Sequence, residues 1–281
     1  MSKGYQYVLR NKERQIMTTS FSDKMPFSEW CDKAKGDLEE LKNFRTNLEY
    51  ASVIPVSYSH QNGQSFLDRI KEQYPHLLDG VLIDKFLRKQ DLGNPPMFEY
   101  EEYGKVDPMV WRFIFLLGRI VEHLGQLDGL SICEIGPGNG ILFKIITDAY
   151  PDVRYTMIDL EGPMWFLQKN VEYYGRESNV KKYLGCQEVM SETYQGDDFD
   201  MVLSECAYNE CYLETQKVYM EKILNRSARG RILCSDSLWT TNNRDEPHWD
   251  HKEIFDNIQH TNKEIVEDGD TGQAIFWHEE E

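Results

Sequence analysis

The feature that most constrains this chain is the alternation of short apolar runs and helical stretches that begins near Leu130. A parallel sheet produces this pattern, because its strands are buried on both faces and are joined by crossover helices. The apolar runs are Leu130 to Ile135, Arg154 to Ile158, Lys182 to Gly185, Phe199 to Leu203 and Arg231 to Cys234. The sequence therefore predicts an α/β protein with a five-stranded parallel core.

The end of the chain departs from this alternation. Two short runs, Glu264 to Glu267 and Ala274 to His278, flank the turn signal Asp268-Gly269-Asp270-Thr271-Gly272 and indicate a hairpin. We expect a mostly parallel, seven-stranded sheet with a C-terminal antiparallel hairpin. This Rossmann-like architecture is typical of class I methyltransferases.

The first third of the chain contains helical patterns and no strand alternation. Apolar positions recur at helical spacing from Ser28 to Leu48 and from Phe66 to Leu87, and Pro108 opens a long apolar helix through Val121. We expect residues 1–105 to form a helical extension and residues 106–281 to form the α/β domain. The extension could act as a lid or join two copies of the chain.

Composition narrows the classes of partner. The chain has 281 residues and a net charge of −17, which repels a phosphate backbone, so nucleic acid is not an expected substrate. The sequence shows no secretory signal, and its longest apolar run, Phe113 to Leu117, is too short to span a membrane. Its six cysteines include no CxxC pair, which favours reduced thiols and a cytoplasmic location.

A glycine-rich segment follows the first strand of the α/β domain. Gly136, Gly138 and Gly140 alternate after Glu134 and precede an apolar helix, which is the context of a nucleotide-binding loop. A dinucleotide fingerprint would need glycine where Ile141 stands, so NAD is disfavoured. The carboxylate of Glu134 suits the ammonium group of a methionine moiety, which favours S-adenosylmethionine (SAM) as ligand and S-adenosylhomocysteine (SAH) as product.

A second acid supports this interpretation. Asp159 ends the next strand, nineteen residues after Gly140, where a carboxylate can accept protons from both ribose hydroxyls. Gln187, after the third strand, is either an adenine contact or a solvated loop residue. Leu160 and Ser204, which follow Asp159 and the fourth strand, complete the expected donor site. The alternative is a tight strand-to-helix turn with Asp159 as a helix cap.

The fourth strand delivers further polar residues to the edge where ligands bind in such sheets. Methyl transfer to a hydroxyl needs close alignment and a base. Glu205 and Glu210 are candidate bases on the segment that follows the strand, and His248 and His251 are candidates further along the chain. Each of the four also has a structural interpretation as a solvated or ion-paired side chain.

Several motifs in order resemble the sugar O-methyltransferases associated with bacterial surface-polysaccharide and glycan biosynthesis. The resemblance covers roughly Gln90 to the end of the chain. It is carried by Asp91-Leu92-Gly93-Asn94-Pro95, Asp107 to Phe113, Glu134 to Gly140, Ile158-Asp159-Leu160, and Ser204 to Glu210 with Tyr219. The resemblance implies SAM as donor, a hydroxyl of a sugar, glycan or nucleotide-sugar as acceptor, and a helical lid. It also implies that Arg112 reaches the donor carboxylate and that Glu210 is the acid of the family motif.

Other possibilities stay open from the sequence. Aromatic residues suited to stacking on a sugar flank the expected acceptor mouth, namely Tyr100, Tyr103, Trp111, Trp239 and Trp249. Core packing is the more frequent fate of a tryptophan, and we expect Trp111 in the core. A metal is possible, because Asp236, Asp245, His248, Asp250 and His251 offer ligands, but their spacing matches no fixed motif and no metal is predicted. The acceptor could instead be a small molecule such as a natural product or an amine. The chain could also be a non-catalytic SAM-binding module.

Overall fold

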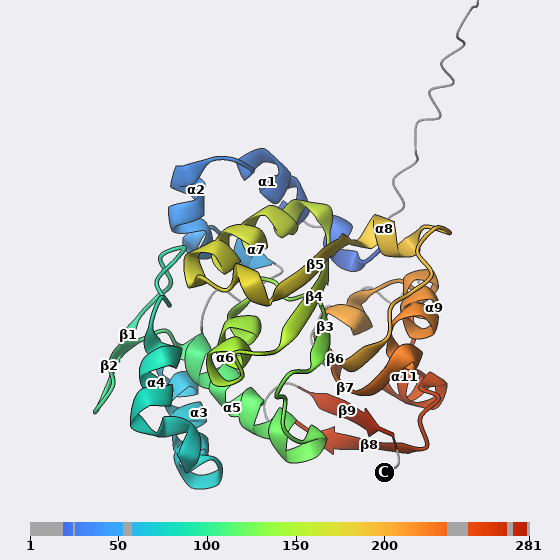
Figure 1. Ribbon diagram of the computed structural model, residues 1–281. Coiled ribbons are helices and arrows are strands. Elements are labelled where there is room, and N and C mark those ends of the chain that lie inside the picture. Colours follow the sequence, from blue (N-terminus) through green and yellow to red (C-terminus); the bar gives the residue numbers. More distant parts are fainter. Residues whose placement is uncertain (1–18, 25, 53–57, 235–246, 269–271, 280–281) are drawn as a thin grey trace, which may run out of the picture.

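The computed structural model describes residues 19–24, 26–52, 58–234, 247–268 and 272–279. Its centre is a seven-stranded sheet in the order β5-β4-β3-β6-β7-β9-β8 (Figure 1). The strands are β3 (Ser131–Ile135), β4 (Arg154–Asp159), β5 (Val180–Gly185), β6 (Phe199–Glu205), β7 (Ser227–Cys234), β8 (Asn262–Glu267) and β9 (Gln273–His278). Strands β3 to β7 are parallel, and β9 is antiparallel to β7 and β8. The predicted Rossmann-like α/β sheet with a closing hairpin is confirmed.

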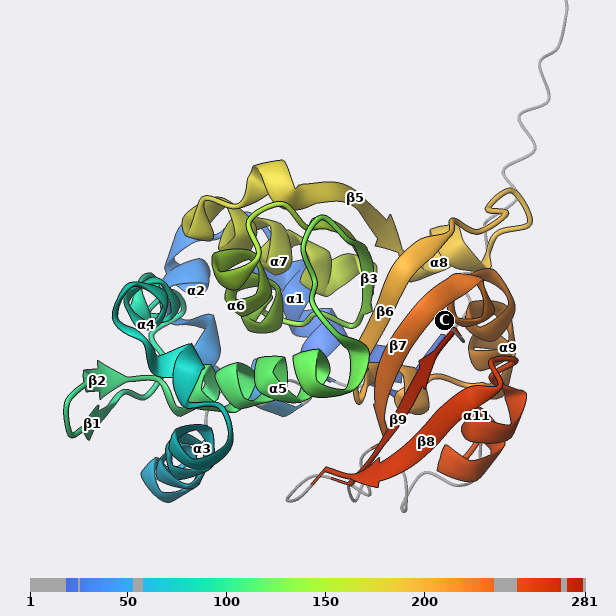
Figure 2. The same ribbon diagram turned by 60° about the horizontal axis from the view of Figure 1, so that its bottom comes forward.

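Helices cover both faces of the sheet. Ile132 and Met157 belong to one buried cluster, together with α5 (Pro108–Leu124) and α6 (Ile141–Ala149). Cys133 and Ile158, one position further along the same strands, belong to a second cluster with α9 (Leu213–Lys222) and α11 (His251–Asn257). Figure 2 shows α5 on one side of the sheet and α9 and α11 on the other. Successive side chains of a strand point to opposite faces, so each apolar run serves both clusters.

The remaining elements surround this core. α3 packs against α5, α4 packs against α6, and α1 packs against α7. The bounds of the other helices are α1 (Pro26–Ala34), α2 (Leu38–Asn43), α3 (His60–Gln73), α4 (Gly80–Leu87), α7 (Glu161–Tyr174) and α8 (Cys186–Met190). Short 3₁₀ turns are η1 (Phe21–Lys24), η2 (Phe44–Thr46), η3 (Tyr50–Ser52), η4 (Pro75–Leu78), η5 (Glu177–Asn179), η6 (Ala207–Glu210) and η7 (Leu224–Arg226).

The start of α5 is fixed by local chemistry and by one long-range ion pair. Pro108 is the first helical residue, and the Asp107 side chain accepts a hydrogen bond from the Met109 backbone N–H at 3.0 Å. The buried Arg45 guanidinium contacts the other Asp107 oxygen at 2.6 Å. The helix predicted from Pro108 is therefore confirmed and continues to Leu124.

Two predicted helices are each broken in the structure. The stretch from Ser28 to Leu48 divides at Gly36, whose φ is +88°, after which Asp37 caps a new helix, α2. The stretch from Phe66 to Leu87 divides at Pro75, which lacks a backbone N–H and begins η4. Predicting one continuous helix in each stretch was wrong, because helical spacing continues across such breaks.

The hairpin of β1 (Phe98–Tyr100) and β2 (Gly104–Val106) was not predicted, because strands of three residues leave no periodic signal. Of the aromatic residues suggested for the acceptor mouth, Tyr100 lies in the core instead, and Trp111 lies in the core as expected. Tyr100 and Trp111 are buried in the core, with their rings edge to face at 5.5 Å. Trp239 lies outside the described residues.

Within the described ranges, no helix has the length and apolar character needed to cross a membrane. All six cysteines lie in these ranges as thiols, and five of them are buried.

Candidate active site

The glycine segment forms a tight loop between β3 and α6. Gly136, Gly138 and Gly140 have φ values of +69°, +57° and +73°, in the left-handed region that other residues rarely adopt. Gly136 also lies against the segment after β6, where a Cβ would collide with the Cβ of Ala207. The loop is therefore held close to the carboxyl end of β6.

Asp159 joins the glycine loop to the end of β4. Its carboxylate accepts hydrogen bonds from the backbone N–H groups of Gly138 at 3.2 Å and Leu160 at 2.8 Å. Burial is the main reason that the pKa of Asp159 rises to about 7. The second strand end and the glycine loop thus meet, as the two motifs predicted.

Glu134 lies beneath this loop and is only 2% exposed. Its Oε2 has no hydrogen-bond partner among the described residues, and burial together with Asp159 raises its pKa to about 8. A buried carboxyl group without a partner is costly and is stabilised by a cationic ligand. Glu134 and Asp159 therefore fit a ligand that carries both an ammonium group and a ribose, as SAM does.

The other residues expected at the donor site differ in how far their side chains are buried. The backbone N–H of Gln187, in α8, donates to Glu161 at 3.1 Å, and its side chain is half-buried. Leu160 is buried directly after Asp159. Ser204 is fully buried; its hydroxyl donates to the Ile135 carbonyl at 3.1 Å and accepts from the Tyr208 N–H at 3.0 Å. In this arrangement Ser204 connects the ends of β3 and β6.

Glu210 lies in η6, shortly after β6, and accepts a hydrogen bond from the Ser22 hydroxyl at 3.3 Å. Burial raises the pKa of Glu210 to about 7, and the Ser22 hydrogen bond opposes that rise. A carboxyl group with a pKa near neutrality can accept a proton at physiological pH. Glu210 therefore has the environment of a general base.

Glu205, the last residue of β6, has a different environment. Arg112 contacts its Oε2 at 3.1 Å, and Arg231 from β7 contacts its Oε1. Two guanidinium groups thus hold the carboxylate, which leaves it poorly available as a base. Arg112, expected at the donor carboxylate, is engaged with Glu205 in this structure.

The two histidines lie at different positions. His248 is half-buried, and its ring lies edge to face against Phe21 at 5.7 Å. The preceding carbonyl, that of Pro247, accepts a hydrogen bond from the Leu213 N–H. His251 is exposed at the first position of α11. His248 is therefore close to the N-terminal segment, and His251 lies at the surface.

Residues near the N-terminus complete the site, and sequence patterns gave no sign of this. Ser20 forms an isolated antiparallel bridge with Cys211, and the Thr19 carbonyl accepts from the Tyr212 N–H at 3.1 Å. Phe21 packs edge to face against Tyr212 at 4.8 Å. The segment that includes Ser22 consequently covers Glu210.

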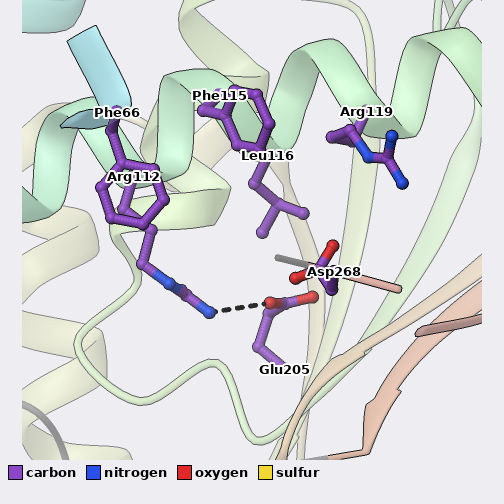
Figure 3. Close-up of a pocket in the computed structure, with 7 residues that line it drawn as sticks. All are labelled: Phe66, Arg112, Phe115, Leu116, Arg119, Glu205 and Asp268. Atoms are coloured by element: carbon purple, nitrogen blue, oxygen red, sulfur yellow. Dashed lines mark hydrogen bonds and ion pairs between the residues drawn. The ribbon is translucent and has the colours of Figure 1, made fainter. Parts of the chain in front are cut away.

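A small pocket lies on the α5 side of β6. Its charged lining consists of Arg112, Arg119, Glu205 and Asp268, and Phe66 and Phe115 stand beside them. Figure 3 shows both arginines on one helix, with the Arg112 guanidinium directed toward Glu205.

The described residues contain no group of three or more His, Cys, Asp or Glu side chains that could hold a metal ion. Of the possible ligands named from the sequence, Asp236 and Asp245 lie outside the described residues.

The fold and the paired acids at the glycine loop define the class of protein, a SAM-dependent methyltransferase of the Rossmann-like class I type. The chain belongs to the lysine methyltransferase family, whose model matches residues 106–259. Family membership supports an enzyme that uses SAM. The non-catalytic module considered from the sequence is therefore set aside.

Solved structures with a similar fold include methyltransferases of low sequence identity. A Nostoc punctiforme PCC 73102 protein described as an O-methyltransferase has 16% identity and a TM-score of 0.46, covering 58% of this chain and 55% of that one. An O-methyltransferase family protein from Burkholderia thailandensis has 12% identity and a TM-score of 0.45, with 78% and 71% covered.

PigF with SAH has 15% identity and a TM-score of 0.44, and the match covers 60% of this chain and 58% of that one. The chain thus spans little more than half of the Nostoc protein and of PigF. No curated protein sequence matches the chain.

Proposed function

We propose that the protein transfers the methyl group of SAM to a hydroxyl of a sugar, a glycan or a nucleotide-sugar. The observation that carries this proposal is Glu210, a half-buried residue after β6 whose carboxyl pKa rises to about 7. A hydroxyl is a weak acid, so its methylation needs a base at the reacting oxygen. An amine that has already lost its proton can be methylated without a general base.

The proposed donor site consists of the glycine loop, Glu134 and Asp159, with Leu160 and Gln187 beside them. Glu134 would pair with the donor ammonium, and Asp159 would accept from the ribose hydroxyls. SAM, when bound, supplies an electrophilic methyl group on a sulfonium. Orientation by these residues would align that methyl group with the acceptor oxygen for in-line displacement.

The acceptor side would perform the proton transfer. Glu210 takes the hydroxyl proton as the new carbon–oxygen bond forms and the carbon–sulfur bond breaks. Ser22, which donates to Glu210 at 3.3 Å, would keep the carboxylate in position. The segment from Thr19 to Ser22 would exclude water from the reacting oxygen. We propose this lid role for the N-terminal extension, residues 1–105, to which the segment belongs. His248 and His251 stay untested candidates.

A lysine side chain is a second candidate acceptor. The family that matches residues 106–259 is described as lysine methyltransferases, and the chain's net charge of −17 attracts a basic peptide. In that case Glu210 would bind the lysine ammonium rather than act on a hydroxyl. Both candidates use the same donor site, so the acceptor has to be identified by experiment.

The experiment uses SAM with a ¹³C-labelled methyl group and two acceptor pools, one of oligosaccharides and nucleotide-sugars and one of lysine-containing peptides. Carbon chemical shifts distinguish an O-methyl from an N-methyl product. We expect O-methylated saccharide, strongly reduced by Glu210→Gln and unchanged by Glu192→Gln, an exposed control. Transfer to peptide nitrogen alone would refute the sugar proposal and favour lysine. The cytoplasmic location and a dimer formed through the N-terminal helices also stay predictions.

A further inference from the structure

Among the described residues, three guanidinium groups and two carboxylates meet at the pocket between α5 and β6. Arg112 and Arg119 line the pocket. Arg231 contacts both lining carboxylates. Arg112 contacts Glu205 at 3.1 Å, and Arg231 contacts Glu205 and also Asp268, the latter at 3.0 Å. These contacts pair two guanidinium groups with two carboxylates. The guanidinium of Arg119, two helical turns after Arg112 on α5, is left over.

Arg119 is only weakly compensated. Its Nη2 is buried without a hydrogen-bond partner among the described residues, and its side chain is 17% exposed. Its Nη1 lies 3.7 Å from Glu122, a half-exposed carboxylate that also accepts from the Tyr74 hydroxyl at 2.5 Å. An exposed carboxylate at this distance contributes little, so one positive charge is nearly unbalanced.

The neighbouring charges increase the cost of this arrangement. Burial lowers the pKa of Arg231 to about 10; Asp268 opposes this effect, whereas Arg112 and Arg119 add to it. The Nε of Arg231 is also buried without a hydrogen-bond partner in the described part of the chain. On the outer side, the Arg69 guanidinium lies 3.9 Å from the centre of the Phe115 ring. An anion in the pocket would relieve this repulsion.

The pocket is next to the proposed donor site. Glu205, which forms one wall, precedes Ala207 by two residues, and Ala207 lies against Gly136 of the glycine loop. The Glu205 wall of the pocket is therefore close in the chain to the residue that packs against the glycine loop. Figure 3 shows Arg112 directed toward Glu205 with Asp268 beside it, and Arg119 further along the same helix.

We propose that this pocket is an anion-binding subsite that receives an oxygen of the acidic group, a carboxylate or a phosphate, of the sugar that is methylated. The planar fork of a guanidinium matches both groups. This inference rests on the proposed sugar acceptor and deepens it: the substrate class is an acidic or phosphorylated saccharide rather than a neutral one.

The test is a calorimetric titration of SAH-saturated protein with three probes, namely glucuronate, glucose 1-phosphate and glucose. The variants are Arg119→Gln, Arg119→Lys and Arg154→Gln; the last removes the same charge from an exposed position at the start of β4. We expect saturable binding of at least one acidic probe and none of glucose. Arg119→Gln should weaken the acidic probe roughly tenfold or more, Arg119→Lys less, and Arg154→Gln not at all. Binding of glucuronate would identify a carboxylate as the acidic group of the substrate, and binding of glucose 1-phosphate would identify a phosphate.

Three results would overturn the inference. The first is equal binding of glucose and the acidic probes, and the second is an unchanged affinity of Arg119→Gln for the acidic probe. The third is a loss of SAH affinity in Arg119→Gln, because that loss would assign the pocket to the donor carboxylate. Thermal melting of each variant controls for folding. Methylation of an acidic sugar at the wild-type rate by Arg119→Gln would refute the subsite and leave the proposed function intact. Transfer only to peptide nitrogen would refute the proposed function.

Discussion

Replacing Glu134 by Gln removes the carboxyl group that would pair, once ionised, with a bound ammonium, while keeping the shape of the side chain. Because Glu134 is 2% exposed and its Oε2 has no hydrogen-bond partner among the described residues, a ligand ammonium is the contact that this change would eliminate. A hydrogen bond to a charged group contributes about 1.5–3 kcal/mol. SAH should therefore bind Glu134→Gln about 10- to 150-fold more weakly than it binds the wild type.

The same variant should change stability in the opposite direction. Burial raises the pKa of Glu134 from 4.5 to about 8, so the folded protein retains a proton that the unfolded chain releases. The stability from this proton is fully present below pH 4.5 and is lost as the pH rises through about 8. The rise in pKa corresponds to up to about 5 kcal/mol. Ligand-free Glu134→Gln should therefore be more stable than the wild type above pH 8 and similar to it at acidic pH.

Calorimetry with SAH and denaturant unfolding across this pH range measure the two effects, with Glu192→Gln as the exposed control. An SAH affinity within twofold of the wild type would refute the ammonium contact. A variant no more stable than the wild type at alkaline pH would show that Glu134 is not buried as described.

Three further predictions concern the acceptor side and the loop. Glu210→Gln should lower kcat about 100-fold or more without weakening the binding of SAH. The wild-type rate should rise with pH through about 7, because the base acts in its ionised form. A rate that does not depend on pH in this range would contradict the role of Glu210 as the base. Ser22→Ala removes a hydrogen bond that lowers the Glu210 pKa, so the acidic limb of the pH–rate profile should move to higher pH while the alkaline plateau is kept. Gly136→Ala places a Cβ at a φ of +69° and against Ala207. It should lower the free energy of unfolding, measured with heat or denaturant, by at least about 2 kcal/mol. An unchanged melting temperature would contradict the described loop.

The meeting of Asp159 with the glycine loop was predictable because its signals are local. Glu134 and the three glycines lie within seven residues, and Asp159 ends the next strand. Strand periodicity places both acids at the same edge of a parallel sheet. Their side chains meet the loop through the Gly138 hydrogen bond at 3.2 Å.

The acceptor side depends on contacts between distant residues. Ser22 and Glu210 are 188 residues apart, and Arg112 and Glu205 are 93 apart. No sequence pattern pairs such residues, because tertiary packing decides which side chains meet. Arg231 illustrates the same point, since it occupies an apolar run that predicted β7, and only the structure reveals its contact with Glu205.

Calorimetric titration with SAH, with NAD as the control ligand, tests the central claim most directly. The account predicts saturable SAH binding at one site per chain, no binding of NAD, and loss of SAH binding in Asp159→Ala. Binding of NAD in preference to SAH, or full SAH affinity in Asp159→Ala, would contradict the assignment of the glycine loop and its two acids as the methyl-donor site.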